Sequence, residues 1–311
     1  MSAKTGHDAG QEIGRLLTAM LTPFKEDGSV DYDGAQRLAQ LLTENGSDGV
    51  VVFGTTGEAP ALSDEEKVEL VSAVKQAIPR HTVMAGAGTN STHHSEELTH
   101  RSLEAGADAI LAVVPYYNKP PAEGMYRHFK AIAEAASGKP VVMYNIQGRT
   151  AVNMSAETTL RCARIPGIVG VKEASGNIDQ MGLVCAGKPA GFNVWSGDDS
   201  FTLPLLAVGG YGVICVVSHI AGPAMKALIE AHLAGENEKA REIHLRLLPV
   251  IRALMTVASN PIPIKMVVNR LGFKAGPFRL PLAPLADSEL DQLMAVVREA
   301  GDLISLPVSV G

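Results

Sequence analysis

Apolar residues along this chain gather in short runs that recur at intervals of roughly 20–35 residues, the length of one strand–helix unit. Each run is apolar almost throughout and rich in β-branched residues. This pattern is typical of a strand that is covered on both faces. The expected strands lie at 16–21, 49–53, 82–87, 109–114, 141–145, 168–172, 193–196 and 212–217.

Helical patterns fill the segments between these runs. Residues 31–44 place apolar side chains at three- and four-residue intervals, as an amphipathic helix does. Ser63 followed by Glu66 predicts a capping box at the start of the next helix. Glycines stand where helices are expected to end, at Gly46, Gly106 and Gly138.

Strands that alternate with helices predict a parallel sheet. Eight such strands favour closure into a (β/α)8 barrel, the TIM-barrel fold, and an open doubly wound sheet is the alternative. Beyond residue 235 the pattern is helical, at 238–257 and 287–300, with a proline-rich joint at 261–263. The expected organisation is a flexible tail at 1–12, a barrel at 13–234 and a helical C-terminal subdomain at 235–311.

Composition narrows the class of protein. The 311 residues are 46% hydrophobic, with a net charge of -6 and no long basic run. This indicates a large core and argues against a nucleic-acid partner. The N-terminus lacks the apolar centre of a signal peptide, and no apolar stretch is long enough for a membrane span. Three cysteines far apart, Cys162, Cys185 and Cys215, argue against disulfides or zinc and fit a cytoplasmic location.

Lys172 closes the sixth expected strand. In a barrel, active sites lie at the C-terminal ends of the strands. Burial of a lysine stem disfavours the ammonium form and lowers the lysine pKa, and a neutral amine attacks carbonyl groups. Lys172 is therefore a candidate Schiff-base lysine. The structural alternative is a solvated lysine just past a strand.

Other polar groups follow other expected strands. The turn at 54–58 reads Gly-Thr-Thr-Gly-Glu, and its hydroxyls and backbone N–H groups suit a small carboxylate, although a plain strand-to-helix turn has the same composition. Tyr117 and Tyr144 are phenols at strand ends that can pass protons or simply pack. Asp198 and Asp199 can hold a divalent cation or begin a helix.

Several strings in the expected order resemble the dihydrodipicolinate synthase and N-acetylneuraminate lyase family of class I aldolases. The likeness runs from about Leu16 to Leu285. The strings are GTTGE at 54–58, PYYNKP at 115–120, YN followed by GRT over 144–150, GVKEASGN at 170–177, SGDD at 196–199 and NPIPIK at 260–265.

The resemblance implies a lyase that condenses pyruvate with L-aspartate 4-semialdehyde to give 4-hydroxy-tetrahydrodipicolinate, on the diaminopimelate route to lysine. Lys172 is implied to form the Schiff base with pyruvate, so neither a metal nor an organic cofactor is expected. Thr55 and Thr56 are implied to hold the pyruvate carboxylate. Thr55, Tyr144 and Tyr117 are implied to relay protons, with Tyr117 supplied by a neighbouring subunit of a homotetramer, a dimer of dimers.

The same resemblance assigns the remaining substrate contacts. Arg149 is implied to hold the carboxylate of the aldehyde substrate. The backbone of Ile214 is implied to line the pyruvate pocket, and Gly197 is expected to bind substrate there. No role is predicted for 260–265 beyond the match itself.

Two departures from the family pattern change the expectations. Gln147 stands where many members have proline, which leaves the second substrate less defined. His94 occupies the acidic position, four places after Asn90, that regulated members use to bind lysine. Asp64 and Lys67 stand where some regulated members have histidines. Inhibition by lysine is therefore expected to be weak or absent.

Three other functions are open. A related pyruvate aldolase or dehydratase would act on a sugar acid or sialic acid. A non-catalytic barrel would bind keto acids or partners without reacting. A metal-dependent aldolase would use Asp198 and Asp199.

Overall fold

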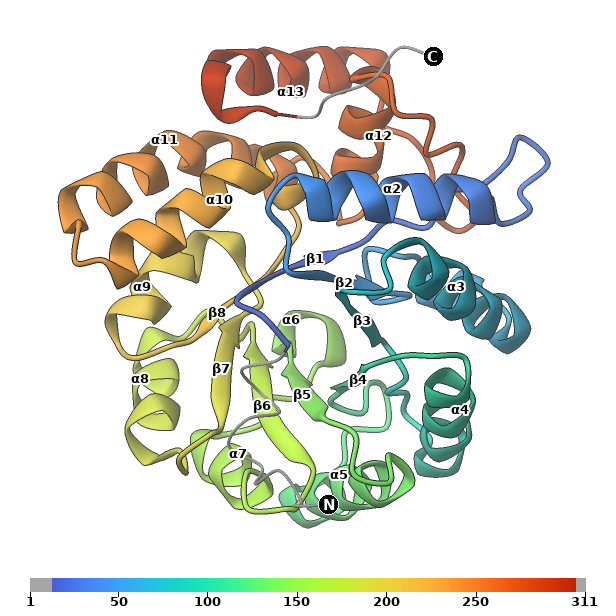
Figure 1. Ribbon diagram of the computed structural model, residues 1–311, viewed down its shortest axis with the longest axis vertical. Helices are drawn as coiled ribbons and strands as arrows, with labels where there is room; N and C mark the ends of the chain where they lie inside the picture. The colour runs from blue at the N-terminus through green and yellow to red at the C-terminus, as the bar shows by residue number, and fades with distance from the viewer. Residues whose placement is uncertain (1–12, 306–311) are drawn as a thin grey trace. The chain divides into compact units, whose positions relative to one another are not determined.

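The computed structural model describes residues 13–305. Its strands close into a parallel barrel in sequence order, β1 to β8 (Figure 1). This confirms the expected TIM barrel over the open sheet. The strands are β1 (Leu16–Ala19), β2 (Gly49–Val52), β3 (Thr82–Ala85), β4 (Ala109–Val113), β5 (Val141–Asn145), β6 (Ile168–Glu173), β7 (Asn193–Ser196) and β8 (Gly212–Cys215).

Helices follow the strands, and within residues 13–305 three short 3-10 helices, η1 to η3, lie in the connections and after α13. The helices up to β8 are α2 (Tyr32–Glu44), α3 (Asp64–Ala77), α4 (Thr92–Glu104), α5 (Ala122–Ala135), α6 (Gln147–Thr150), α7 (Ala156–Cys162), α8 (Ile178–Gly187) and α9 (Thr202–Ala207). Those after β8 are α10 (Ser218–Leu233), α11 (Asn237–Thr256), α12 (Ile262–Arg270) and α13 (Asp287–Glu299). The 3-10 helices are η1 (Ala59–Ala61), η2 (Asp199–Phe201) and η3 (Gly301–Leu303).

The chain divides into two compact units. The central unit comprises 13–15 and 82–214 of the described residues. Its register pairs Tyr144 with Lys172 and Asn145 with Glu173. Because side chains alternate between the two faces of a strand, Tyr144 and Lys172 share one face and Asn145 and Glu173 share the other. Both pairs are buried.

The terminal unit comprises 16–81 and 215–305 of the described residues. It contains β1, β2, α2 and α3 together with the C-terminal helices. Within this unit α11 packs on α10 and α13, and α12 packs on α13 (Figure 1). The C-terminal helices therefore belong to the same compact unit as the first two strands.

The boundaries of six expected strands differ from the observed ones by one or two residues. The first strand shows why, because Met20 and Leu21 stay buried after β1 has ended at Ala19. Apolar burial thus continues beyond the last ladder residue, and the sequence pattern follows burial. The capping box at Ser63 is confirmed, as are the helix ends before Gly46, Gly106 and Gly138, which all have positive φ.

The proline-rich joint needs a correction. Ile262 and Pro263 form the first turn of α12, which runs to Arg270. Proline is tolerated in the first turn because its missing N–H has no partner there in any helix. The three-part division into 1–12, 13–234 and 235–311 stays a prediction, and the tail lies outside the described residues.

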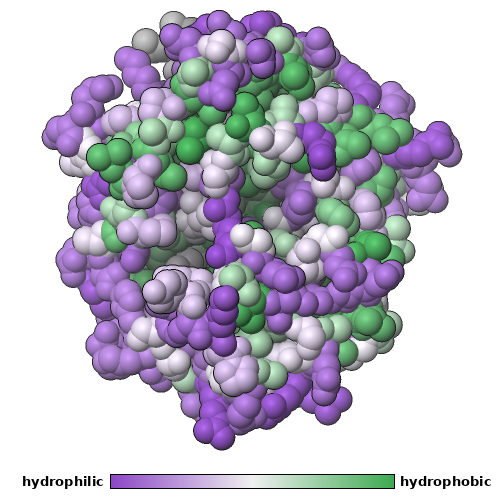
Figure 2. Space-filling model, turned by 180° about the vertical axis from the view of Figure 1, so that it is seen from behind, coloured by the Kyte–Doolittle hydropathy of each residue, from purple (hydrophilic) through white to green (hydrophobic). Residues whose placement is uncertain are grey.

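No helix within 13–305 is long and apolar enough to span a bilayer. The face in Figure 2 shows hydrophilic residues interspersed with apolar ones. All three cysteines are free thiols, and Cys162 and Cys215 are buried. Burial raises the pKa of the Cys162 thiol to about 11.

Candidate active site

Lys172 lies near the end of β6 with 6% of its surface exposed. Its Nζ stands 4.3 Å from the centre of the Tyr144 ring on the neighbouring strand β5. The register of the two strands sets this contact, because it places the two residues side by side on one face. A buried amine and a phenol therefore meet at the C-terminal ends of adjacent barrel strands, where the chemistry of this fold is located.

Gly197 follows β7 and leaves room for the lysine stem. A Cβ at this position would lie 2.7 Å from the Cβ of Ala174 and 3.0 Å from the Cγ of Lys172. Its backbone N–H donates to the carbonyl of Glu173 at 2.8 Å. Gly197 therefore fixes the backbone beside Lys172 and permits the close packing of its side chain.

A polar network holds the opposite face of the same two strands. The Glu173 carboxylate is fully buried and accepts hydrogen bonds from Asn145 Nδ2, Gln180 Nε2 and the Ser175 N–H at 2.8–3.1 Å. Asn145 also donates to Asn153 and accepts from the Met154 N–H. A buried carboxylate needs such donors, so the network locks β5 to β6 and with them Tyr144 beside Lys172. This network was not predicted from the sequence, although a Glu directly after the lysine of a buried strand is a visible signal.

The turn after β2 carries Thr55 and Thr56. Thr56 is 2% exposed, and its Oγ1 accepts a hydrogen bond from Asn260 Nδ2 at 3.0 Å. The turn closes through Gly57 N–H to Gly54 O at 3.1 Å and Glu58 N–H to Thr55 O at 3.2 Å. Glu58 has φ 56°, in the left-handed region that non-glycine residues rarely occupy. Such a conformation persists only where the surroundings over-determine it.

An ion pair without solvent contact supplies that restraint. Lys265 Nζ on α12 donates to Glu58 Oε1 at 2.7 Å, and both side chains are fully buried. The amine also donates to Thr22 O at 3.1 Å and lies 4.3 Å from the Phe24 ring centre. Burial lowers the pKa of Lys265, and the Glu58 carboxylate opposes that shift.

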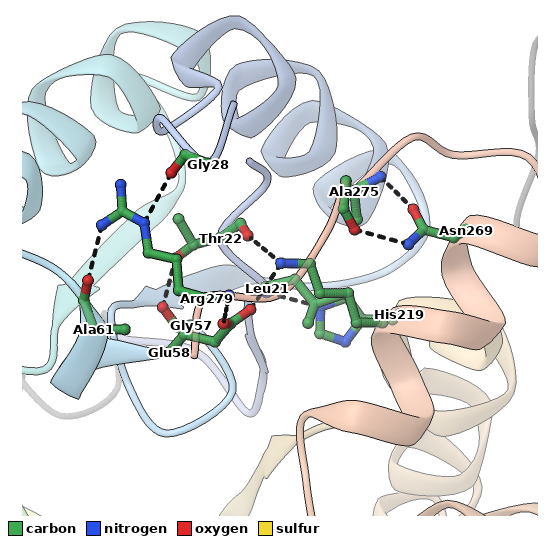
Figure 3. Close-up of polar contacts among 12 residues, drawn as sticks. Leu21, Thr22, Gly28, Gly57, Glu58, Ala61, His219, Asn269, Ala275 and Arg279 are labelled. Carbon is green, nitrogen blue, oxygen red and sulfur yellow. Dashed lines mark hydrogen bonds and ion pairs between the residues drawn. The ribbon is translucent and has the colours of Figure 1, made fainter. Parts of the chain in front are cut away.

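Arg279 closes the other side of this cluster (Figure 3). Its backbone N–H donates to Glu58 Oε2 at 3.2 Å, and its guanidinium donates to Gly28 O and Ala61 O, both at 2.8 Å. The guanidinium also forms a two-bond pair with the Glu66 carboxylate at 2.6 and 2.7 Å. Hydrogen bonding from Arg279 lowers the pKa of Glu66.

The chain segment after β1 also contacts the turn (Figure 3). Thr22 Oγ1 donates to Gly57 O at 2.7 Å, and His219 Nε2 accepts from the Leu21 N–H at 3.1 Å. His219 Nδ1 donates to Val216 O at 2.8 Å, which fixes the neutral tautomer. Burial lowers the pKa of His219 to about 4.

Three further site residues expected from the sequence differ from one another in exposure. Tyr117 is 88% exposed and has φ 70°, and Arg149 is exposed on the one-turn helix α6. Ile214 is fully buried on β8. Asp198 accepts from the Ser200 N–H and so caps η2, as the helix-start alternative predicted.

A buried strand-end lysine with a phenol against its amine, in a TIM barrel, fits the class I aldolases, which work through a lysine Schiff base. The chain matches the model of the Dihydrodipicolinate synthetase family over residues 12–300 and belongs to that family.

Individual relatives support membership of this family. The chain is 52% identical to the 4-hydroxy-tetrahydrodipicolinate synthase of Moorella thermoacetica over 289 residues, 93% of this chain and 98% of that protein. It is similar to the dihydrodipicolinate synthase (DHDPS) of Cyanidioschyzon merolae, solved with lysine bound, at 46% identity and a TM-score of 0.91, covering 93% and 99% of the two chains. The chloride-inhibited enzyme of Acinetobacter baumannii, complexed with pyruvate, is 37% identical with a TM-score of 0.89, covering 93% and 99%.

Replacing Lys265 tests the buried ion pair. Lys265→Met leaves the Glu58 carboxylate buried without a counter-charge, and we expect it to lower the free energy of unfolding by about 3–5 kcal/mol. Adding Glu58→Gln removes the stranded charge and should recover part of that loss. Urea denaturation measures both.

The matched control is Arg270→Met on the same helix. Arg270 pairs with Asp291 at 3.1 Å, but both side chains are more than half exposed. Its loss should therefore cost less than about 1 kcal/mol. Equal losses for Lys265→Met and Arg270→Met would contradict the restraint assigned to Lys265.

His219 gives a pH dependence with a defined sign. Its pKa is about 4 in the folded chain against 6.5 as the ordinary value. Between these values the unfolded chain binds the proton and the folded chain does not, so stability is lost as pH falls from 6.5 to 4. The loss from this group is about 3 kcal/mol, since one pKa unit is worth about 1.4 kcal/mol.

The measurement is the free energy of unfolding at several pH values for the wild type and His219→Gln. The variant should show a flatter profile between pH 6.5 and 4. His128, whose pKa burial also lowers to about 4, titrates in both proteins and cancels in the comparison. Parallel profiles would show that His219 does not titrate as described.

Proposed function

We propose that this chain condenses pyruvate with L-aspartate 4-semialdehyde and releases 4-hydroxy-tetrahydrodipicolinate, with Lys172 as the Schiff-base residue. The observation that carries the proposal is the buried Lys172 amine, 4.3 Å from the Tyr144 ring at the rim of the barrel. Membership of the family and the named relatives support it. We also propose that the protein works in the cytoplasm, in keeping with its three free thiols.

The chemistry begins with the neutral Lys172 amine, which adds to the ketone carbon of pyruvate. The resulting carbinolamine takes up a proton and loses water, which gives the protonated imine, an electron sink. The pyruvate methyl group then loses a proton and becomes the enamine carbon, which adds to the aldehyde carbon of the second substrate. The amine of that substrate displaces Lys172 as the ring closes, so the lysine is regenerated and no outside oxidant or reductant is consumed.

Proton transfers in these steps need a hydroxyl close to the imine nitrogen. Tyr144 is the proposed shuttle, working with Thr55 and with Tyr117 from a neighbouring subunit. The high exposure of Tyr117 in the single chain fits a residue that serves a partner. We therefore propose a homotetramer built as a dimer of dimers.

Substrate recognition is assigned to the groups around this chemistry. Thr55 and Thr56 hold the pyruvate carboxylate, while Gly197 and the backbone of Ile214 line the pyruvate pocket. Arg149 binds the carboxylate of the aldehyde, since an exposed guanidinium on a short helix can reach an incoming anion. An acidic aldehyde fits Arg149 better than the polyol of a sugar acid does.

Borohydride trapping tests the proposed chemistry. With pyruvate present, borohydride adds hydride to the imine carbon and fixes pyruvate on the lysine nitrogen, and peptide mass analysis should place the adduct on Lys172. Lys172→Ala should give no adduct and no turnover. Tyr144→Phe should still form the adduct but lower kcat by about 100-fold or more, because only the proton shuttle is lost.

The matched control is Lys188→Ala, which removes a lysine that donates to Phe192 O on the loop before β7. It should leave both the adduct and turnover intact. A wild-type adduct on another lysine, or none, would refute the proposal. Turnover with N-acetylneuraminate but not with aspartate semialdehyde would instead favour the sugar-acid alternative.

Feedback by lysine is proposed to be weak. His94 lies in the first turn of α4 and lacks the carboxylate that would bind an ammonium group. Asp64 cannot substitute freely, since it pairs with Lys67 at 3.0 Å. Steady-state rates should show no half-inhibition at sub-millimolar lysine, and His94→Glu should increase sensitivity. Sub-millimolar inhibition of the wild type would contradict this.

A further inference from the structure

One contact between the C-terminal segment and the turn at 54–58 is made at the Thr56 hydroxyl. Asn260 stands two residues before α12, and its Nδ2 donates to Thr56 Oγ1 at 3.0 Å. Thr56 is almost completely buried. The two residues are 204 positions apart in sequence, so this contact exists only because the C-terminal helices pack in the same unit as β2.

The direction of this hydrogen bond decides what the hydroxyl can do next. A threonine hydroxyl has one hydrogen to donate and two lone pairs that accept. Because Asn260 occupies a lone pair, the hydroxyl hydrogen stays available for another acceptor. A carboxylate accepts hydrogen bonds only, and bonds to charged acceptors are the stronger kind.

We propose that Asn260 is a positioning residue that presents the Thr56 hydroxyl as a donor to the carboxylate of the 2-oxo acid substrate. This inference rests on the proposed function, in which Thr56 holds the pyruvate carboxylate. Asn260 touches Thr56 and is assigned no contact with the reacting atoms.

Asn260 can do this because the segment that carries it is anchored on the same turn. Five residues further on, Lys265 donates to the Glu58 carboxylate and to Thr22 O. Thr22 in turn donates to Gly57 O. The segment at 260–265 is therefore hydrogen-bonded to the turn at two points, at Thr56 through Asn260 and at Glu58 through Lys265. This gives the string at 260–265 a function that its sequence alone does not reveal.

Three substitutions separate this role from simple packing. Asn260→Ala removes the donor. Asn260→Asp keeps the size and shape but offers an ionised acceptor, which turns the Thr56 hydrogen toward itself and away from the substrate. Thr56→Val removes the hydroxyl while keeping the shape. We expect the pyruvate concentration for half-maximal borohydride adduct on Lys172 to rise about tenfold for Asn260→Ala and more for Asn260→Asp, as for the loss of a hydrogen bond to a charged group.

Acetone supplies a second readout, because it is the same kind of methyl ketone without the carboxylate. The concentration of acetone that half-saturates trapping on Lys172 should be unchanged in all three variants. A structural defect at the turn would weaken trapping of both ketones. In the Thr56→Val background, Asn260→Ala should have no further effect on pyruvate, because the group it acts through is absent.

Asn269→Ala is the matched control for a loosened C-terminal segment. Asn269 lies near the end of α12, accepts from the Ala275 N–H at 2.7 Å and donates to Gly276 O (Figure 3). This variant should lose stability in urea yet keep the wild-type response to pyruvate. If Asn260→Ala does not fold, the isosteric Asn260→Asp carries the test.

The outcomes distinguish the proposed function from the role of Asn260. No adduct on Lys172 in the wild type, or no pyruvate effect of Thr56→Val, overturns the proposed function. A pyruvate effect of Thr56→Val with a wild-type response of Asn260→Asp overturns the role of Asn260 alone. Equal weakening for acetone and pyruvate, or undiminished effects of Asn260→Ala on the Thr56→Val background, also overturns it.

Discussion

The buried ion pair between Lys265 and Glu58 is the interaction on which the turn at 54–58 depends. Charges without water are costly unless each finds a partner and further hydrogen bonds. The Glu58 carboxylate accepts hydrogen bonds from Lys265 Nζ and from the backbone N–H of Arg279. Lys265 Nζ also donates to Thr22 O. Both charges are satisfied while the backbone of Glu58 has a positive φ. The left-handed backbone and the ion pair therefore occur together in the turn that carries Thr55 and Thr56.

The same physics operates in the central unit with a different solution. The Glu173 carboxylate is as fully buried as Glu58, yet amide donors from Asn145 and Gln180 satisfy it instead of a cation. A neutral partner suits this position, since a cation beside Lys172 would change the electrostatic environment of its amine. The two faces of β5 and β6 therefore carry different side-chain contacts. One face presents Tyr144 and Lys172, and the other fixes their spacing.

The barrel and the positions of Lys172 and Tyr144 could be predicted from the sequence, because strands buried on both faces leave a strong local pattern of apolar residues. The number and order of strands and the place of Lys172 and Tyr144 at strand ends followed from short apolar runs alone. The contacts of Asn260 with Thr56 and of Lys265 with Glu58 join residues more than 200 positions apart. Hydrophobic periodicity carries no information about such pairings. The helix α12 was missed for a local reason, since its first turn contains Pro263 and prolines usually mark a break.

Two charged residues in the family motifs, Glu58 and Lys265, did nevertheless carry a signal from which their contact could have been predicted. The GTTGE turn ends in Glu58, to which the family resemblance assigns no role. The NPIPIK string ends in Lys265, which is flanked by apolar residues. A lysine in an apolar segment must either meet an anion or stay neutral. The simplest explanation for both residues is that each neutralises the charge of the other. The structure shows them as a fully buried ion pair. Charged residues left over after a mechanism has been assigned are therefore best sought as partners of one another, because burial makes an isolated charge the costlier alternative.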